Sequence, residues 1–210
     1  MRNIITLVAA LFLTTFAFAN NNPAYETAMQ TALKTINVDH PIWAEAATDF
    51  EAIVKENPTE WLPLYYHALA NTNASHDVDM TEKDAYLDKA QASLDKAKKM
   101  ETDEVELTIL QANIYMMRIT VNPNLRGMTY SSKAFGALNK AKMQDAENPR
   151  IYIFWGLMVY NMPEHFGGGV LEANGYFNTA KAKFATFEAA SELHPIWGER
   201  LNNKMLASYE

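Results

Sequence analysis

Residues 149–180 read PRIYIFWGLMVYNMPEHFGGGVLEANGYFNTA and contain two side-chain patterns with helical spacing. The first half is almost wholly apolar, with large side chains three or four positions apart. The second half has small, large and small side chains at offsets of four and then three positions, which puts them on one face of a helix. The stretch therefore predicts two packed helices joined by the glycine-rich segment. The residues are Tyr152, Trp155, Gly156 and Val159 in the first helix and Ala173, Phe177 and Ala180 in the second.

The small–large–small pattern occurs four times in the chain. Its first alanines lie 44, 44 and 39 residues apart. Two of the three positions are small in most copies, so a neighbouring helix can approach closely there. A second, more apolar helix follows each of the first three copies, and hairpins of this kind must stack because neither helix buries its apolar face alone. The copies are Ala46-Phe50-Ile53, Ala90-Leu94-Ala97, Ala134-Leu138-Ala141 and Ala173-Phe177-Ala180.

These units resemble the tetratricopeptide repeat, which pairs a W-x2-L-G-x2-Y helix with an A-x3-F-x2-A helix. Tyr152, Trp155, Gly156 and Val159 occupy the first helix of one unit, and Ala173 begins the motif of its second helix. The family repeats every 34 residues, whereas these units are longer. We expect the excess residues to lie in loops between the paired helices, at 71–83, 120–132 and 161–170.

The resemblance implies an all-α fold: a tetratricopeptide-like solenoid of stacked antiparallel hairpins, with capping helices at both ends. About eight to ten helices are expected in one domain over residues 20–210. A narrower likeness, carried by Pro163–Gly169 and His194–Gly198, is to exported tetratricopeptide-like proteins of Bacteroidetes and, more loosely, to the periplasmic T-component associated with TRAP transporters. The expected units are a half unit at 41–58, hairpins at 59–101, 103–146 and 149–192, and a capping helix at 195–210.

Residues 1–19 are typical of a signal peptide. Arg2 precedes an apolar run from Ile4 to Phe18, which is too short to span a membrane as a helix, and Ala17-Phe18-Ala19 fits a cleavage site before Asn20. The 210-residue chain has no cysteine, which excludes disulfides, thiolate chemistry and a lipoprotein anchor. We therefore expect an exported protein, periplasmic or secreted, that is not a lipoprotein and has no membrane insertion after cleavage.

The sequence predicts no enzyme, no metal site and no cofactor. The formal net charge of −7 argues against nucleic acid as a partner. The five histidines have no metal-ligand spacing, and no nucleophile–base set stands out. Gly167–Gly169 fits a tight turn with positive φ better than a phosphate loop. Tyr130–Ser132 is interpreted as a turn or cap, and the tetrapeptides 40–43 and 194–197, both His-Pro-Ile-Trp, as helix starts with inward tryptophans.

The most specific functional expectation concerns the first helix of each hairpin, which lines the concave surface in the resembled family. The positions that would face the concavity are mainly apolar and aromatic, and Tyr66, Tyr115 and Tyr160 would form a ladder of rings there. The alternative is that this surface is filled by the chain's own helix at 24–36 or at 196–209. The candidate binding residues are Tyr66, Leu69, Ala112, Tyr115, Met116, Leu157, Tyr160 and Asn161.

Two functions follow from such a surface. The first is a non-catalytic exported binding module that acts as an adaptor or assembly factor for envelope proteins. The second is a periplasmic carrier that holds a hydrophobic small molecule in an aromatic-lined helical cavity, with or without an associated transporter. The expected partner is therefore a protein or a hydrophobic ligand, and the sequence leaves oligomer formation open.

Overall fold

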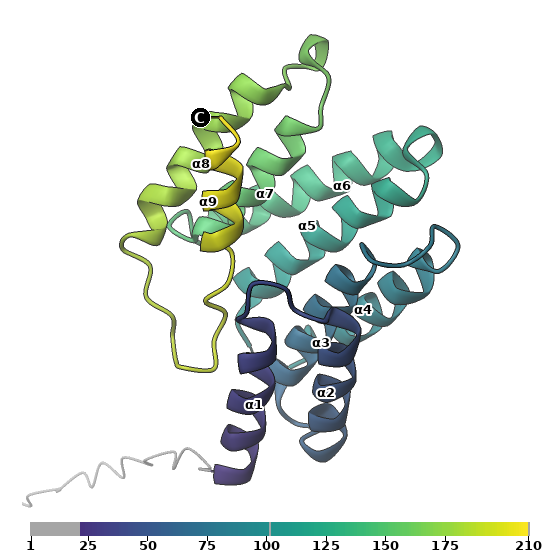
Figure 1. Cartoon of the computed structure of the whole chain (residues 1–210), viewed down its shortest axis with the longest axis vertical. Helices are drawn as coiled ribbons and strands as arrows, with labels where there is room; N and C mark the ends of the chain where they lie inside the picture. Colours follow the sequence, from purple (N-terminus) through teal and green to yellow (C-terminus); the bar gives the residue numbers. More distant parts are fainter. Residues whose placement is uncertain (1–21, 101, 210) are drawn as a thin grey trace, which may run out of the picture.

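The structure, a computed structural model, describes residues 22–100 and 102–209. Within these ranges the chain is all-helical with no strand, which confirms the all-α prediction (Figure 1). The expected signal peptide lies outside the described residues. The α-helices are α1 (Pro23–Ile36), α2 (Trp43–Glu56), α3 (Trp61–Ala74), α4 (Lys83–Ala97), α5 (Glu104–Val121), α6 (Pro123–Gln144), α7 (Pro149–Tyr160), α8 (Val170–Phe184) and α9 (Glu199–Ala207), with a short 3₁₀ helix at Glu164–Phe166.

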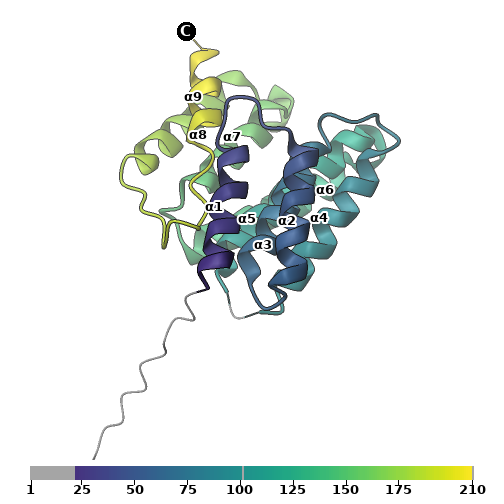
Figure 2. The same cartoon turned by 60° about the horizontal axis from the view of Figure 1, so that its bottom comes forward.

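Helices that follow each other in the chain pack side by side. The most extensive contacts join α5 to α6, α7 to α8, α3 to α4 and α2 to α3. In addition, α3 contacts α5 and α5 contacts α7, so these three helices form an inner row (Figures 1 and 2). Two large core clusters result, one built mainly by α1 to α4 and the other by α5 to α8.

The four repeated alanines lie in the seams between helices. They begin the motifs of α2, α4, α6 and α8 and are at most 1% exposed. An alanine at such a seam lets two helix backbones approach closely, and the large residue of each motif fills the adjacent space. The four residues are Ala46, Ala90, Ala134 and Ala173.

The segment between the two longest helices corrects one sequence expectation. A loop was expected at 120–132, with a turn or cap at Tyr130–Ser132, but α6 begins at Pro123 and runs for 22 residues through these positions. Asn122 caps it, because its side chain accepts a hydrogen bond from the Leu125 backbone N–H at 3.2 Å. The excess residues of this unit therefore lengthen α5 and α6 instead of forming a loop.

An ion-pair network holds the added turns of α6 against α4. Arg126 donates from both terminal nitrogens to the two oxygens of Asp84, at 2.7 and 2.8 Å. Arg118 of α5 donates to Asp84 at 2.6 Å and to Asp88 at 2.5 Å. Two arginines and two carboxylates thus join three helices near their hairpin ends. The hydrogen bond from Arg126 is the main reason that the pKa of Asp84 falls from 3.8 to about 2.

Stability should depend on pH through Asp84. Folding lowers this pKa, so the ionised carboxyl stabilises the fold above about pH 4, and the stabilisation disappears as pH falls toward 2. We expect Asp84→Asn to cost about 1 kcal/mol at pH 7 and almost nothing at pH 2. Urea denaturation of both proteins across this range measures the difference. A cost that does not change with pH would show that the Asp84 charge contributes nothing.

The glycine-rich turn between α7 and α8 has the predicted conformation. Gly167 and Gly169 have φ values of 81° and 115°. Gly168 is required because of space and not because of its φ. A Cβ at this position would lie 2.1 Å from the Met162 carbonyl oxygen. The chain reverses here because three consecutive residues lack side chains.

A buried ion pair connects α5 to α7. Arg150 Nη2 donates to Glu106 Oε1 at 2.5 Å, and the two side chains are 1% and 3% exposed. The same carboxylate accepts from Asn148 Nδ2 at 2.6 Å and from the Tyr65 hydroxyl at 3.3 Å. The negative charge is therefore satisfied by three donors from α3, α7 and the residue that caps α7.

The irregular segment 185–198, between α8 and α9, covers this ion pair. In Figure 1 it runs from the end of α8 down toward α1 and back to α9. Trp197 Nε1 donates to the Tyr65 hydroxyl at 2.9 Å, and its ring lies 5.5 Å from the Arg150 guanidinium. Trp197 packs inward as predicted and contacts both large clusters, but the next helix begins only at Glu199, after Gly198 with φ of 113°.

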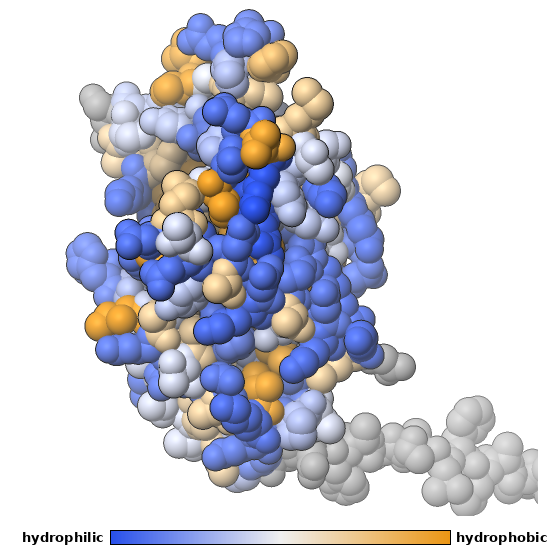
Figure 3. Space-filling view, turned by 90° about the vertical axis from the view of Figure 1, so that its right-hand side faces the viewer, coloured by the Kyte–Doolittle hydropathy of each residue, from blue (hydrophilic) through white to orange (hydrophobic). Residues whose placement is uncertain are grey.

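Two surface properties bear on function. In the part of the chain that the structure describes, no helix combines the length and apolarity needed to cross a bilayer. The face drawn in Figure 3 is mostly hydrophilic, with apolar residues in separate patches. No continuous apolar surface is visible on that face.

Candidate functional site

The candidate binding residues fall into two groups according to burial. Three are inside the core, at 2% exposure or less, and contribute to packing between helices. The others are half-buried or, for the last residue, exposed. The buried residues are Tyr66, Leu69 and Ala112, and the accessible ones are Tyr115, Met116, Leu157, Tyr160 and Asn161.

The three tyrosines expected to form a ladder do not share one surface. The Tyr66 hydroxyl donates to the Leu193 carbonyl at 3.0 Å, so the chain's own segment 185–198 covers it. Tyr115 faces α6, with its ring 5.9 Å from that of Tyr130. Tyr160 packs against the small core cluster of α7, α8 and α9. The alternative that the chain fills this surface itself therefore holds at Tyr66, where the segment 185–198 and the N-terminal helix α1 both contribute.

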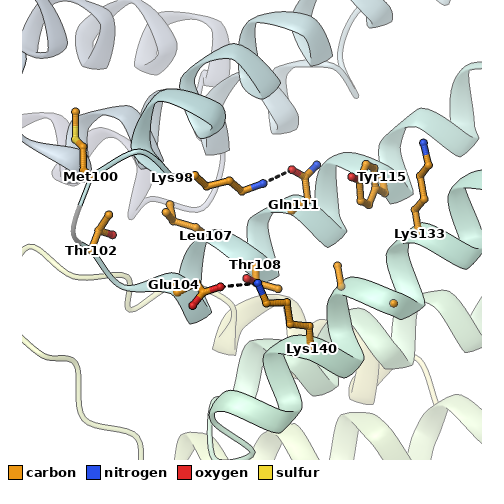
Figure 4. Close-up of a pocket in the computed structure, with 12 residues that line it drawn as sticks. Lys98, Met100, Thr102, Glu104, Leu107, Thr108, Gln111, Tyr115, Lys133 and Lys140 are labelled. Carbon is orange, nitrogen blue, oxygen red and sulfur yellow. Dashed lines mark hydrogen bonds and ion pairs between the residues drawn. The ribbon is translucent and has the colours of Figure 1, made fainter.

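Tyr115 instead borders a cleft between α5, α6 and the residues that follow α4, which we call the α4–α5–α6 cleft (Figure 4). Its cavity volume of about 510 Å³ lies within the range of 300–1,000 Å³ usual for small-molecule sites. Helix α5 supplies residues at 104, 108, 111 and 115, and α6 supplies residues at 133, 137 and 140, so each helix presents one continuous face. The cleft is lined by Lys98, Met100, Thr102, Glu104, Leu107, Thr108, Gln111, Tyr115, Lys133, Gly136, Ala137 and Lys140.

One wall of the cleft is fixed by an amide pair. The side chains of Gln91 and Gln111 donate to each other at 2.9 and 2.8 Å. Lys98 Nζ donates to Gln111 Oε1 at 2.5 Å. Burial lowers the pKa of Lys98; the charge of Asp95 opposes this change and the charge of Lys140 adds to it. Lys98, the C-cap residue of α4, and Lys140 of α6 thus place two amino groups in the lining of one cleft.

The other wall is formed by α6. Lys140 Nζ lies 2.5 Å from Glu104 Oε1, an ion pair between α6 and the first turn of α5. Lys133 Nζ lies 5.8 Å from the centre of the Tyr115 ring and 5.1 Å from that of Tyr130, close enough for cation–π attraction. Burial raises the pKa of Tyr115, so its hydroxyl is neutral at physiological pH. The cleft thus offers an aromatic ring, aliphatic side chains and several amino groups to one ligand.

A second cavity, of about 300 Å³, lies beside Tyr66. It is bordered by the end of α1 and by the segment 185–198, including Trp197 and His194. His194 Nδ1 is hydrogen-bonded to Ser191 Oγ at 2.7 Å. No group of three or more histidine and acidic residues in the described ranges could hold a metal ion. This cavity is smaller, and it is formed by the chain folding back over its own core.

Sequence reasoning missed the three lysines of the larger cleft. The expected site consisted mainly of apolar and aromatic positions, whereas the residues that were missed are charged. Lys133 and Lys140 are seven residues apart, with Ala137 between them on the same helix face. Such a stripe is ordinary on a solvated helix. Only the packing of α6 against α5 turns it into the wall of a cleft.

Comparisons with known proteins identify a fold but no family. No protein-family model and no curated protein sequence matches this chain. Among solved structures, the chain is similar to the HusA haemophore from Porphyromonas gingivalis, with a TM-score of 0.77 and 24% sequence identity. The match covers 87% of this chain and 90% of the other. At this identity the likeness establishes a shared all-helical fold and nothing finer.

Proposed function

We propose that this protein is an exported, non-catalytic carrier of a hydrophobic small molecule, which it holds in the α4–α5–α6 cleft. The observation that carries the proposal is the cleft itself, with a volume of about 510 Å³ and apolar side chains from α5, from α6 and from Met100 after α4. Ala137 and the ring of Tyr115 offer apolar contact area to a ligand, with the buried Leu107 behind them. Nothing in the cleft resembles a catalytic set of groups.

Porphyrins are the first ligand class to test, with haem as the example. The fold is shared with a protein described as a haemophore, and a flat macrocycle suits a cleft between two helix faces. Met100 and Tyr115 are residue types that bind haem iron in other proteins. Titration with both haemin and metal-free protoporphyrin IX separates binding through iron from binding through the ring.

Filling the cleft should abolish binding without harming the fold. Gly136 lines the cleft and a Cβ there meets no atom within 4 Å, so Gly136→Phe adds a ring at the cleft wall. We expect at least a tenfold loss of haemin affinity, measured by absorbance titration, because the ring occupies the ligand's volume. Gly175→Phe is the matched control, since Gly175 of α8 is equally unobstructed and lies outside the cleft. Equal affinity in both variants would reject the cleft as the site.

The adaptor function is the second candidate, together with a tetratricopeptide-like arrangement of the hairpins α3–α4, α5–α6 and α7–α8. Large apolar side chains exposed near the hairpin ends favour it: Leu125 is 81% exposed, Met128 91% and Leu171 85%. Replacing these three residues with serine should remove any envelope protein that co-purifies with the mature chain. Haemin affinity should stay unchanged in the same variant.

A further inference from the structure

The charges in the α4–α5–α6 cleft differ from those of the whole protein. The chain has a formal net charge of −7, yet the lining residues include three lysines and one carboxylate. Figure 4 shows the amino groups of Lys98 and Lys133 on either side of Gln111 and Tyr115. A neutral hydrophobic ligand would gain no electrostatic attraction from this local excess of positive charge.

Only one of these three lysines forms an ion pair within the described residues, and Asp95, three residues before Lys98, acts on Lys98 at longer range. Lys140 pairs with Glu104. Lys98 is bonded to the neutral amide oxygen of Gln111, and Lys133 lies over the rings of Tyr115 and Tyr130. These neighbours hold each amino group in place without neutralising it. Two oriented positive charges therefore remain at the edge of a cleft whose lining also includes Leu107, Tyr115 and Ala137.

We infer that the cleft selects an amphipathic anion, with an apolar body over Leu107 and Tyr115 and one or more carboxylates at Lys98 and Lys133. The inference rests on the proposed function for the identity of the site, and it adds the ligand's charge class. A carboxylate that replaces the Gln111 contact of Lys98 gains a charge-assisted hydrogen bond. A neutral ligand would leave both amino groups partly desolvated without compensation.

The test compares three double variants with the wild-type protein. Lys98→Gln/Lys133→Gln removes both charges, and Lys98→Arg/Lys133→Arg keeps them. Lys89→Gln/Lys181→Gln is the matched control, because it removes two charges at exposed sites outside the cleft. The probes are protoporphyrin IX, its neutral dimethyl ester in the same detergent, and the fluorescent apolar sulfonate 1-anilinonaphthalene-8-sulfonate.

The inference predicts that wild type binds protoporphyrin IX about tenfold or more tightly than the ester. The glutamine pair should abolish this preference, whereas the arginine pair and the control pair should retain it. Affinity for the diacid should also fall with added salt in the wild type and much less in the glutamine pair. Equal affinity for diacid and ester, or an unchanged preference in the glutamine pair, overturns the inference while the carrier function stands.

The sulfonate probe separates the two proposals. If neither porphyrin binds, the porphyrin class fails, and the anion inference is then decided by the sulfonate alone. Fluorescence enhancement that is lost in the glutamine pair and kept in the control supports the inference. Absence of enhancement in the wild type, or equal enhancement in all variants, overturns it.

Discussion

Replacing Glu106 with leucine should destabilise the protein by about 3–5 kcal/mol. The Arg150 side chain is 1% exposed, and Glu106 is the acidic group that neutralises its charge. Without that carboxylate, a guanidinium remains buried, and the donors on Asn148 and Tyr65 also lose their acceptor. Urea denaturation of wild type and variant at pH 7 measures the change in the free energy of unfolding.

A double variant separates the cost of the orphaned charge from the value of the pair. Glu106→Leu/Arg150→Met replaces both groups with apolar side chains of similar size, so we expect it to recover a large part of the lost stability. If the double variant is as unstable as the sum of the two single variants, the charges do not interact. The assignment of this pair as the polar centre of the fold would then be wrong.

Removing the Trp197 side chain should cost about 3 kcal/mol. The indole contacts both large core clusters, lies over Arg150 and donates a hydrogen bond to Tyr65. Trp197→Ala therefore leaves a cavity between the two halves of the molecule and frees the segment 185–198. Thermal and urea unfolding measure the loss, and limited proteolysis within that segment should become faster.

The neighbouring residue supplies the control for this experiment. Ile196 is 57% exposed, so Ile196→Ala changes the same segment without removing a buried contact. We expect a cost below about 0.5 kcal/mol there. Similar costs for the two variants would mean that Trp197 is not an anchor of the C-terminal segment.

Much of the fold could be predicted because its determinants are local. The spacing of Ala134, Leu138 and Ala141 reports one buried helix face, and all three are fully buried. The glycines at 167 and 169 could be assigned to a turn because their positive φ values disfavour other residues. The length of α6 could not be predicted, since the pairing of Arg126 with Asp84 joins residues 42 positions apart.

The position of the candidate site could not be predicted, because it is determined by contacts between residues far apart in the sequence. Tyr66 is a residue type that is common at recognition surfaces. However, the carbonyl of Leu193, 127 residues away, accepts its hydrogen bond, and the segment around Leu193 covers the tyrosine. Tyr115 remains accessible because α6 leaves a cleft beside it. Both are tyrosines on inner helices, and only the tertiary path of the chain determines which one a ligand can reach.

The most direct test of the central claim is methyl NMR with diamagnetic protoporphyrin IX as the ligand. The two cavities have separate methyl groups: Leu107 and Ala137 line the α4–α5–α6 cleft, whereas Leu33 and Ile36 line the cavity beside Tyr66. Our account predicts saturable shifts at Leu107 and Ala137, with Leu33 and Ile36 unaffected. Saturable shifts confined to Leu33 and Ile36 would contradict it.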